Sequence, residues 1–391
     1  MHRRELLGFL AGSPFWTGMT QLEGEPAITS PEQALSVFDF ERVASQTLPP
    51  AHWGYLATGV DNDVTLRANR AGFEKIPIRA RRLVDVKEVD TSVEIFGTAW
   101  ETPIVLAPVG SQRAFHADGE LAAARAARSK GHLQILSTMT TSAVEEVIEA
   151  RGAPVWYQLY PTASWEVTRG LVSRAERAGC PALVLTVDLP VVSYRETAQR
   201  WARLDSRDCS VCHEEGPTYF RLRSKPMFDG LDTRGLTDLD SPSITWDFIG
   251  RLKDITDMKV LVKGIVTPED AAMAVTSGAD GIIVSNHGGR ADESGVATIE
   301  VLGGIVGTVR GRIPVLVDSG FRRGTDIFKA LALGANGVAV GRPYIWGLAS
   351  FGQEGVEMVL SILRKELELA MRLAGATSCA GIDRSFVRRP M

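Results

Sequence analysis

Long apolar stretches, excess positive charge and cysteine are all scarce in this sequence. No stretch reaches the roughly 18 consecutive apolar residues that a transmembrane helix needs, so a permanent membrane span is not expected. With 43 Lys and Arg against 47 Asp and Glu, the net charge is −4, which offers no basic surface for nucleic acid. The four cysteines, Cys180, Cys209, Cys212 and Cys379, are too few for a disulfide scaffold. What remains, 45% hydrophobic and 23% charged residues, is typical of a globular enzyme.

The first 30 residues differ from the rest of the chain. Arg3 and Arg4 precede a short apolar stretch at residues 6–12, a pattern typical of twin-arginine export signals. We therefore expect a leader over residues 1–30 and a periplasmic or exported enzyme domain over residues 31–391. The alternative is a short amphipathic starter helix in a cytoplasmic protein, because no clean cleavage site of small residues follows the apolar stretch.

From about residue 103 onwards, short apolar runs alternate with longer segments of helical period. The eight runs lie at residues 104–107, 134–136, 155–158, 183–186, 260–262, 281–284, 315–317 and 337–340. The helices expected between them lie at residues 119–130, 142–150, 166–178, 268–277 and 325–333. Near-continuous apolar runs are typical of parallel strands that are covered on both faces, and eight strand–helix repeats close naturally into a barrel.

The repeats predict an α/β fold of the TIM (β/α)8 barrel type over about residues 103–375. Helical patterning over residues 31–75 predicts an N-terminal helical cap, and a long insertion at about residues 197–245 separates the fourth strand from the fifth. A chain of 391 residues could hold two average domains, but a barrel with a cap and an insertion accounts for it as one.

A polar or glycine-rich group follows almost every predicted strand. In strand order, these groups are Pro108-Val109, Ser137, Tyr160, Asp188, Lys263, Ser285-Asn286-His287, Asp318-Ser319-Gly320 and Gly341-Arg342. Barrel enzymes carry their active sites at the carboxyl ends of the strands, so this placement favours an enzyme.

Two glycine-rich loops at the last two strand ends suggest a phosphate site. The loops at residues 318–324 and 337–342 combine glycines, which let backbone N–H groups approach a ligand, with arginines that can grip an anion. Either loop alone could simply end a strand, but consecutive loops of this kind lie where barrels commonly bind phosphate.

The turn at residues 285–290 places an imidazole and a guanidinium three positions apart. His287 can accept a proton near neutral pH, and Arg290 can clamp a carboxylate. Asp188 could orient the histidine, and Arg195 is a second carboxylate anchor. Lys263 is costly inside a barrel mouth unless it meets an anion, such as a reduced flavin.

The segments at residues 262–264, 285–290, 318–326 and 341–343 resemble the FMN-dependent 2-hydroxy acid dehydrogenase and oxidase family. This family includes glycolate oxidase, lactate oxidase and dehydrogenase, and mandelate dehydrogenase. The resemblance covers roughly residues 38–378. The remaining matching segments are residues 55–59, 69–70, 158–160 and 107–113, the last of which looks like the hydroxymandelate-oxidising members.

For the substrate, the resemblance implies a base, a partner for that base and a carboxylate clamp. His287 would be the base, and Asp188 would pair with its imidazolium. Arg290 and Arg195 would hold the substrate carboxylate. The further catalytic residues would be Tyr55, Tyr160 and Lys263.

For the cofactor, the resemblance implies FMN at the same strand ends. Lys263 would stabilise negative charge at the N1 and O2 edge of the flavin. Further flavin contacts are implied for Ala107, Pro108, Val109, Ser137, Gln158, Thr186 and Ser285. Contacts on the phosphate side are implied for Asp318, Gly320, Arg322, Gly341 and Arg342.

This sequence departs from the family pattern at three places. Residues 291–293 read Ala-Asp-Glu where the family usually has Gln-Leu-Asp, so the support of Arg290 is in question. Ser319 replaces a usual glycine in the phosphate loop. Phe115 and His116 lie in the first strand–helix loop, with an unknown effect on the pocket.

The insertion carries a second motif, Cys209-Ser210-Val211-Cys212-His213, which matches the c-type haem attachment signature. Two thiols form thioether links to the haem and the histidine ligates iron; Met227 could be the second axial ligand. The alternatives are a disulfide, a small metal site or coincidence. Haem attachment needs an exported protein, as does the twin-arginine start. However, haem is normally attached to unfolded chains, and the insertion is small for a haem domain.

Together these patterns predict oxidation of an L-2-hydroxy acid, similar to lactate or mandelate, to the 2-oxo acid, with flavin N5 as acceptor. Oxygen, a cytochrome or a quinone would reoxidise the flavin, and a homo-oligomer is expected. Two alternatives are an FMN-dependent isomerase on a similar barrel and a non-catalytic flavin or haem electron carrier. The paired arginines and Tyr55 count against an isomerase, and a carrier would need no pair such as His287 and Asp188.

Overall fold

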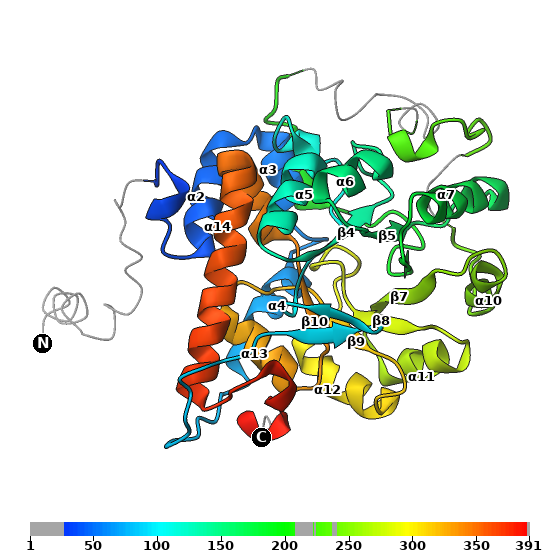
Figure 1. Cartoon of the computed structure of the whole chain (residues 1–391). Helices are drawn as coiled ribbons and strands as arrows, with labels where there is room; N and C mark the ends of the chain where they lie inside the picture. Colours follow the sequence, from blue (N-terminus) through cyan, green and yellow to red (C-terminus); the bar gives the residue numbers. More distant parts are fainter. Residues whose placement is uncertain (1–26, 208–221, 223, 237–240, 389–391) are drawn as a thin grey trace, which may run out of the picture.

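In the computed structural model, the residues described are 27–207, 222, 224–236 and 241–388. Eight parallel strands close into a barrel in the order β10-β3-β4-β5-β6-β7-β8-β9, and helices surround it (Figure 1). The barrel strands are β3 (Ile104–Leu106), β4 (Leu133–Ser137), β5 (Trp156–Leu159), β6 (Ala182–Thr186), β7 (Lys259–Ile265), β8 (Gly281–Val284), β9 (Val315–Val317) and β10 (Gly337–Val340). Each predicted run overlaps one of these strands, and the predicted TIM-type barrel is confirmed.

Helices follow the strands and cover the outside of the barrel. They are α5 (Gly119–Ser129), α6 (Val144–Arg151), α7 (Trp165–Arg177), α10 (Asp247–Lys253), α11 (Pro268–Thr276), α12 (Thr298–Val309), α13 (Gly324–Ala332) and α14 (Arg342–Ala374). The five predicted helices are all present. The sequence pattern missed α12 because Gly303, Gly304 and Gly307 are poor helix formers. Burial of its apolar face, which includes Leu302 and Ile305, holds this helix in place.

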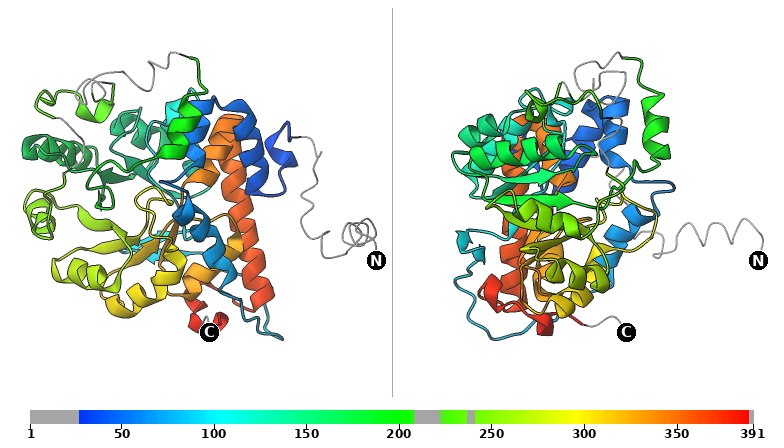
Figure 2. Two further views of the ribbon diagram at one scale, coloured as in Figure 1. Left: turned by 180° about the vertical axis from the view of Figure 1, so that it is seen from behind. Right: turned by 90° about the vertical axis from the view of Figure 1, so that its right-hand side faces the viewer.

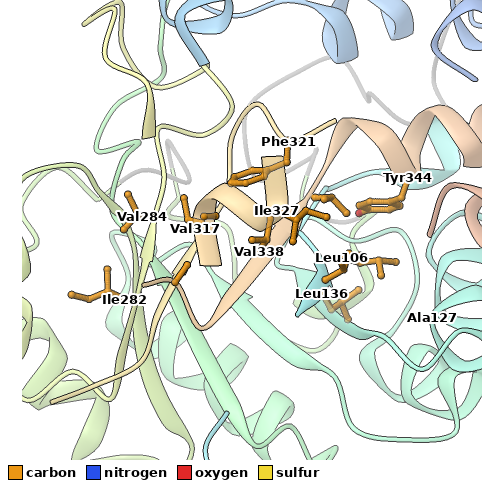
Figure 3. Packing of buried hydrophobic residues seen from close by; sticks show 14 of the residues in the cluster. Leu106, Ala127, Leu136, Ile282, Val284, Val317, Phe321, Ile327, Val338 and Tyr344 are labelled. Carbon is orange, nitrogen blue, oxygen red and sulfur yellow. The ribbon is translucent and has the colours of Figure 1, made fainter. Parts of the chain in front are cut away.

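The apolar side chains form two layers, one inside the barrel and one between the barrel and its helices. Val105, Ile135 and Leu316 belong to the inner cluster. The outer layer includes Val338 of β10 and Ile327 of α13, which Figure 3 shows close together with Tyr344 of α14. The strands are therefore apolar on both faces, which explains why they read as continuous apolar runs.

A short hairpin closes the amino-terminal end of the barrel, and the sequence pattern did not predict it. Its strands are β1 (Val93–Ile95) and β2 (Thr98–Trp100). Ile95 and Phe96 pack with the inner cluster, and the rings of Phe96 and Trp156 lie 5.6 Å apart. Because this end is filled with apolar side chains, only the carboxyl ends of the strands remain for a polar site.

The predicted helical cap is present, and it precedes the hairpin in the sequence. It comprises the 3-10 turn η2 (Pro31–Gln33), α2 (Val37–Thr47), α3 (Pro50–Ala57) and α4 (Val64–Glu74). Helix α2 packs along the long helix α14, and both remain side by side in each view of Figure 2. This packing holds α3, which carries Tyr55, over the barrel mouth. Residues 1–26, most of the expected leader, lie outside the described part of the chain.

The insertion between β6 and β7 contributes α8 (Glu196–Ala202) and the 3-10 turn η4 (Pro226–Phe228). Cys209, Cys212 and His213 of the haem signature lie outside the described residues. Met227 is described, and its side chain is completely buried in the main hydrophobic core beside Phe228. Met227 as an axial ligand stays a prediction, because the cysteines and the histidine of the haem signature lie outside the described residues. No helix in the described ranges is both long and apolar enough to cross a membrane.

Candidate active site

A cavity of about 280 Å³ opens at the carboxyl ends of the barrel strands. Loops from opposite sides of the barrel and helix α3 of the cap contribute to its walls. Of the predicted site residues, those that line it are Tyr55, Ala107, Pro108, Val109, Ser137, Tyr160, Lys263, His287, Arg290, Asp318, Gly320, Arg322, Gly341 and Arg342. The structure therefore brings together side chains that lie up to 287 positions apart in the sequence, from Tyr55 to Arg342.

His287 lies in a left-handed turn directly after β8, with φ 58°. Its Nδ1 is 2.8 Å from Oδ1 of Asp188, and its Nε2 is 3.2 Å from the hydroxyl of Tyr160. Burial lowers the pKa of His287 below its ordinary value, although Asp188 acts in the opposite direction. The imidazole is therefore neutral at pH 7 and can accept a proton, as a general base requires.

A chain of alternating charges continues from this pair to the barrel interior. The Lys263 ammonium lies 3.7 Å from Asp188 and 3.5 Å from Asp318, and it donates to Oγ of Ser285 at 2.9 Å. Burial lowers the pKa of Lys263, but Asp318 and Asp188 together outweigh it and raise the pKa above its ordinary value. The lysine is thus held as a cation in a buried place.

A glycine makes room for this chain of charges. Gly264 follows Lys263 at an irregularity in the pairing of β7 with β8 and has φ 114°. A Cβ atom at this position would lie 2.7 Å from Cβ of Asp188. Only glycine combines this backbone conformation with such a close approach.

Two arginines converge on Tyr55. Arg290 and Arg195 both donate to the backbone carbonyl of Tyr55, at 2.6 and 2.8 Å, and their guanidinium carbons lie 4.2 and 4.8 Å from the centre of its ring. Neither arginine has an ion-pair partner within 4.0 Å in the described part of the chain. Burial, and then the charge of Arg290, lower the pKa of Arg195 to about 9. Two close cations of this kind suit a carboxylate ligand.

The turn that carries Arg290 is held by contacts with the cap and with the segment that follows β6. Ser193 donates its hydroxyl to the carbonyl of Arg290 at 2.8 Å. The carboxylate of Glu293 accepts from the backbone of Asn62 and Val64, at 2.9 and 3.0 Å, at the start of α4. The departure at residues 291–293 therefore keeps an acidic anchor for the turn. The support of Arg290, which the sequence left in question, thus includes this acidic anchor.

The surroundings of Tyr55 include two residues that the sequence analysis left open or missed. Phe115 is buried, and its ring lies 6.3 Å from that of Tyr55. Lys225, from the insertion, is 97% buried (3% exposed) and donates to Oγ of Ser111 at 2.7 Å. Burial raises the pKa of Tyr55, but Arg290, Arg195 and Lys225 outweigh it and lower the pKa overall. No sequence signal marks Lys225, which simply precedes the apolar run of η4.

Several predicted contacts lie just behind the cavity wall. Gln158 Oε1 accepts from Ser137 at 3.2 Å, which leaves the Nε2 donor of Gln158 buried without a partner in the described part of the chain. Oγ1 of Thr186, at the end of β6, is also buried without a hydrogen-bond partner in the described part of the chain. A buried polar atom that makes no hydrogen bond is unfavourable by about 1–3 kcal/mol. Two such atoms at neighbouring strand ends indicate a polar ligand.

The residues predicted for the phosphate side all line the cavity, and the two arginines among them also contact other parts of the protein. Arg342 donates to the carbonyls of Leu56, Thr58 and Gly288, at 2.6, 3.0 and 2.8 Å, so it ties the cap to the turn that carries His287. Arg322 stacks over Trp346 at 4.6 Å, and burial lowers its pKa to about 10.

At this end of the cavity the backbone is exposed to a ligand. A Cβ atom at Gly341 would meet nothing closer than 3.9 Å, so its backbone faces open space beside the two arginines. With the apolar wall at residues 107–109, the unpaired donors and Lys263, the cavity fits FMN. The apolar wall suits a flavin ring, the donors suit its heteroatoms, and the arginines suit its phosphate.

Comparison with known proteins agrees with this geometry. Residues 44–389 match the family model described as FMN-dependent dehydrogenase. The chain is 41% identical over 347 residues to L-lactate oxidase of Lysinibacillus sphaericus, which covers 88% of this chain and 90% of the relative. It is also 41% identical over 367 residues to glycolate oxidase 1 of Oryza sativa subsp. indica, which covers 90% of this chain and 95% of the relative. A crystal structure of mandelate oxidase with (S)-2-phenylpropionate aligns with a TM-score of 0.79 and 38% identity, over 91% of this chain and 98% of that one.

Proposed function

Because this chain belongs to the family of FMN-dependent dehydrogenases, whose similar members are 2-hydroxy acid oxidases, we propose that it oxidises an L-2-hydroxy acid with an apolar side chain, such as lactate or mandelate, to the 2-oxo acid. One observation supports this most directly. His287 and Arg290 line one cavity, where Asp188 supports His287 at 2.8 Å and Arg195 lies beside Arg290 on the carbonyl of Tyr55. Val109, Met139 and Leu189 also line that cavity, which suits an apolar substituent on the acid.

Oxidation of a 2-hydroxy acid removes the hydroxyl proton and the hydrogen on C2 together with two electrons. His287 receives a proton, and Asp188 stabilises the imidazolium that results. Arg195 and Arg290 hold the carboxylate, and Tyr55 and Tyr160 orient the hydroxyl toward His287. FMN, when bound, supplies the acceptor for the two electrons. Lys263 would hold FMN at its N1 and O2 edge, where its positive charge would stabilise the negative charge of the reduced flavin.

The first test is reduction of the purified FMN-loaded enzyme without oxygen. L-lactate and (S)-mandelate are each mixed with the enzyme, and the D- or R-enantiomer of the same acid serves as the matched control. We expect bleaching of the flavin absorbance with the L or S form and little with the other. An unchanged flavin spectrum with both acids and with other small 2-hydroxy acids would refute the proposal. Reoxidation by air or by cytochrome c then identifies the acceptor.

We further propose that the protein is exported and that its insertion carries a covalent c-type haem. The support is the sequence alone, namely the paired arginines at positions 3 and 4 and the spacing Cys209, Cys212 and His213. A haem in the insertion would make a cytochrome or quinone, rather than oxygen, the acceptor. A homo-oligomer stays a prediction, which light scattering on the purified protein can measure.

A further inference from the structure

The residue after Asp318 has a backbone conformation that is unfavourable for its type. Ser319 has φ 76° and is followed by Gly320 with φ 86°. The left-handed region costs a residue with a Cβ atom roughly 1–2 kcal/mol, which glycine avoids. Ser319 stands where the resembled family usually has glycine. Its side chain is 92% buried (8% exposed) and lines the cavity. Because the backbone strain at Ser319 is unfavourable, contacts of its hydroxyl must offset that strain.

The hydroxyl of Ser319 makes two hydrogen bonds to different loops. It accepts from the backbone N–H of Gly288 at 2.9 Å and donates to Oδ1 of Asp318 at 2.7 Å. Gly288 directly follows His287, and residues 287, 288 and 289 all have positive φ. The hydroxyl therefore joins two neighbouring left-handed turns, one after β8 and one after β9.

These two bonds close a ring of contacts. Asp318 lies 3.5 Å from Lys263, Lys263 lies 3.7 Å from Asp188, and Asp188 lies 2.8 Å from His287. From His287 the backbone leads to Gly288 and through its N–H back to Ser319. Without the hydroxyl, the direct bond between the two turns would be lost. Ser285, whose Oγ accepts from the backbone N–H of His287 at 3.0 Å and from Lys263 at 2.9 Å, would still link the turn of the base to the lysine.

We propose that Ser319 is a positioning residue that fixes the turn of the catalytic base to the carboxylate facing Lys263. The role of His287 as base rests on the function proposed above. The bond to Gly288 restrains the main chain that carries the imidazole. The bond to Asp318 withdraws negative charge from the carboxylate, so that Lys263 is shared between Asp318 and Asp188.

The test compares Ser319→Gly with wild type. Glycine suits φ 76° and removes only the hydroxymethyl group. We expect the rate of flavin reduction by the 2-hydroxy acid to fall by about 10- to 100-fold, the scale that a misplacement of up to an ångström costs. Binding of oxalate, followed by calorimetry, should not change, because Arg195 and Arg290 make no contact with Ser319. The melting temperature should change little, because relief of the backbone strain offsets the loss of the two hydrogen bonds.

Arg310→Gly is the matched control. Arg310 is an exposed residue with φ 52° at the end of α12, so glycine relieves the same kind of strain outside the site. It should raise the melting temperature without changing the rate or oxalate binding. A Ser319→Gly enzyme that reduces flavin at the wild-type rate overturns the proposal. So does one that loses oxalate binding and thermal stability in parallel with its rate, since that pattern is a general structural defect.

A second measurement separates this proposal from the proposed function. The midpoint potential of bound FMN, measured against redox dyes, needs no hydroxy acid. In Ser319→Gly the carboxylate of Asp318 loses its donor, so a more negative potential is expected beside Lys263. If the wild-type enzyme oxidises no 2-hydroxy acid, the proposed function is refuted. The shift in midpoint potential would still show that the hydroxyl of Ser319 acts on Asp318 and Lys263. An unchanged potential overturns the electrostatic part of the link.

Discussion

His287 acts as a base because of its surroundings, since burial keeps it neutral and Asp188 aligns it. Replacement by alanine removes the proton acceptor but none of the atoms that hold FMN in the fit described above. We expect His287→Ala to retain FMN and to reduce it at least ~10²-fold more slowly, the lower range for loss of a general base. Stopped-flow absorbance measures the rate, and the flavin-to-protein absorbance ratio checks cofactor content. Near-normal reduction would remove His287 from this role.

The pH dependence of kcat/KM should follow the protonation of His287. Its pKa lies below the ordinary value of about 6.5, so activity should persist at pH 6.5 and be lost at lower pH as the imidazole is protonated. The groups that face it are Asp188, Lys263, Arg290 and the Tyr160 hydroxyl. Of these, only Asp188 raises its pKa by charge.

Asp188→Asn tests this assignment. Burial, Lys263 and Arg290 all lower the pKa of His287, so loss of the carboxylate should move the acid limb of the profile to lower pH. The plateau should fall by roughly 10²-fold, because the imidazolium loses its counter-ion. A limb that moves to higher pH, or stays in place, would contradict the pairing.

Arg290 shows why geometry matters as much as charge. Arg290→Lys keeps the positive charge but cannot present a planar fork to a carboxylate. One lost charged hydrogen bond is worth about 1.5–3 kcal/mol, so KM for the 2-hydroxy acid should rise by roughly 10-fold or more. Steady-state kinetics measure this, with the exposed Arg200→Lys as the control. An unchanged KM would mean that Arg195 alone holds the acid.

At the scale of elements, the bulge of β7 determines where Asp188 can lie. Gly264→Ala introduces both a left-handed strain and a contact of 2.7 Å with Asp188. Gly278→Ala is the matched control, because Gly278 has φ 83° with nothing within 4 Å of the added Cβ. We expect Gly278→Ala to lose about 1–2 kcal/mol of stability with normal kinetics. Gly264→Ala should lose more stability and at least ~10-fold in flavin reduction.

Denaturant melts and stopped-flow kinetics distinguish the two glycine variants. Equal stability and equal rates in both would show that β7 can shift without moving Asp188.

Sequence patterns predicted some of the helices and strands but not all of them. The strands and α5, α6, α7, α11 and α13 were predicted, whereas α10, α12, α14 and the hairpin β1–β2 were missed. Tertiary burial, rather than local propensity, stabilises α12 and the hairpin.

For the whole molecule, the haem proposal determines which acceptor reoxidises the flavin. Expression in a periplasm with haem-attachment machinery should give a red protein with a sharp c-type band after dithionite. The band should survive acid–acetone extraction, because thioether links are covalent, and should vanish in Cys209→Ala with Cys212→Ala. The buried pair Cys180 and Cys379 offers the control substitutions. A purely yellow protein made under these conditions would defeat the haem proposal and leave the flavin site unaffected.

Local sequence patterns are sufficient to predict the barrel and the place of the site. Parallel strands covered on both faces must be apolar along their whole length, and the polar groups after them must meet at one end. Local patterns therefore carried enough information for the fold, for His287 and for the glycine-rich loops. Phe115, Lys225 and the anchor Glu293 could not be predicted, because their partners lie far away in the chain.

Only the tertiary structure decided how these residues pair. It directed Arg342 to three backbone carbonyls, placed Met227 in the core, and joined Ser319 to Gly288 across two strand ends. Such contacts depend on loop paths and side-chain rotamers set by the closed barrel. A hydrogen bond requires its atoms within about 3 Å, whereas a sequence pattern specifies only which face or strand end a residue occupies.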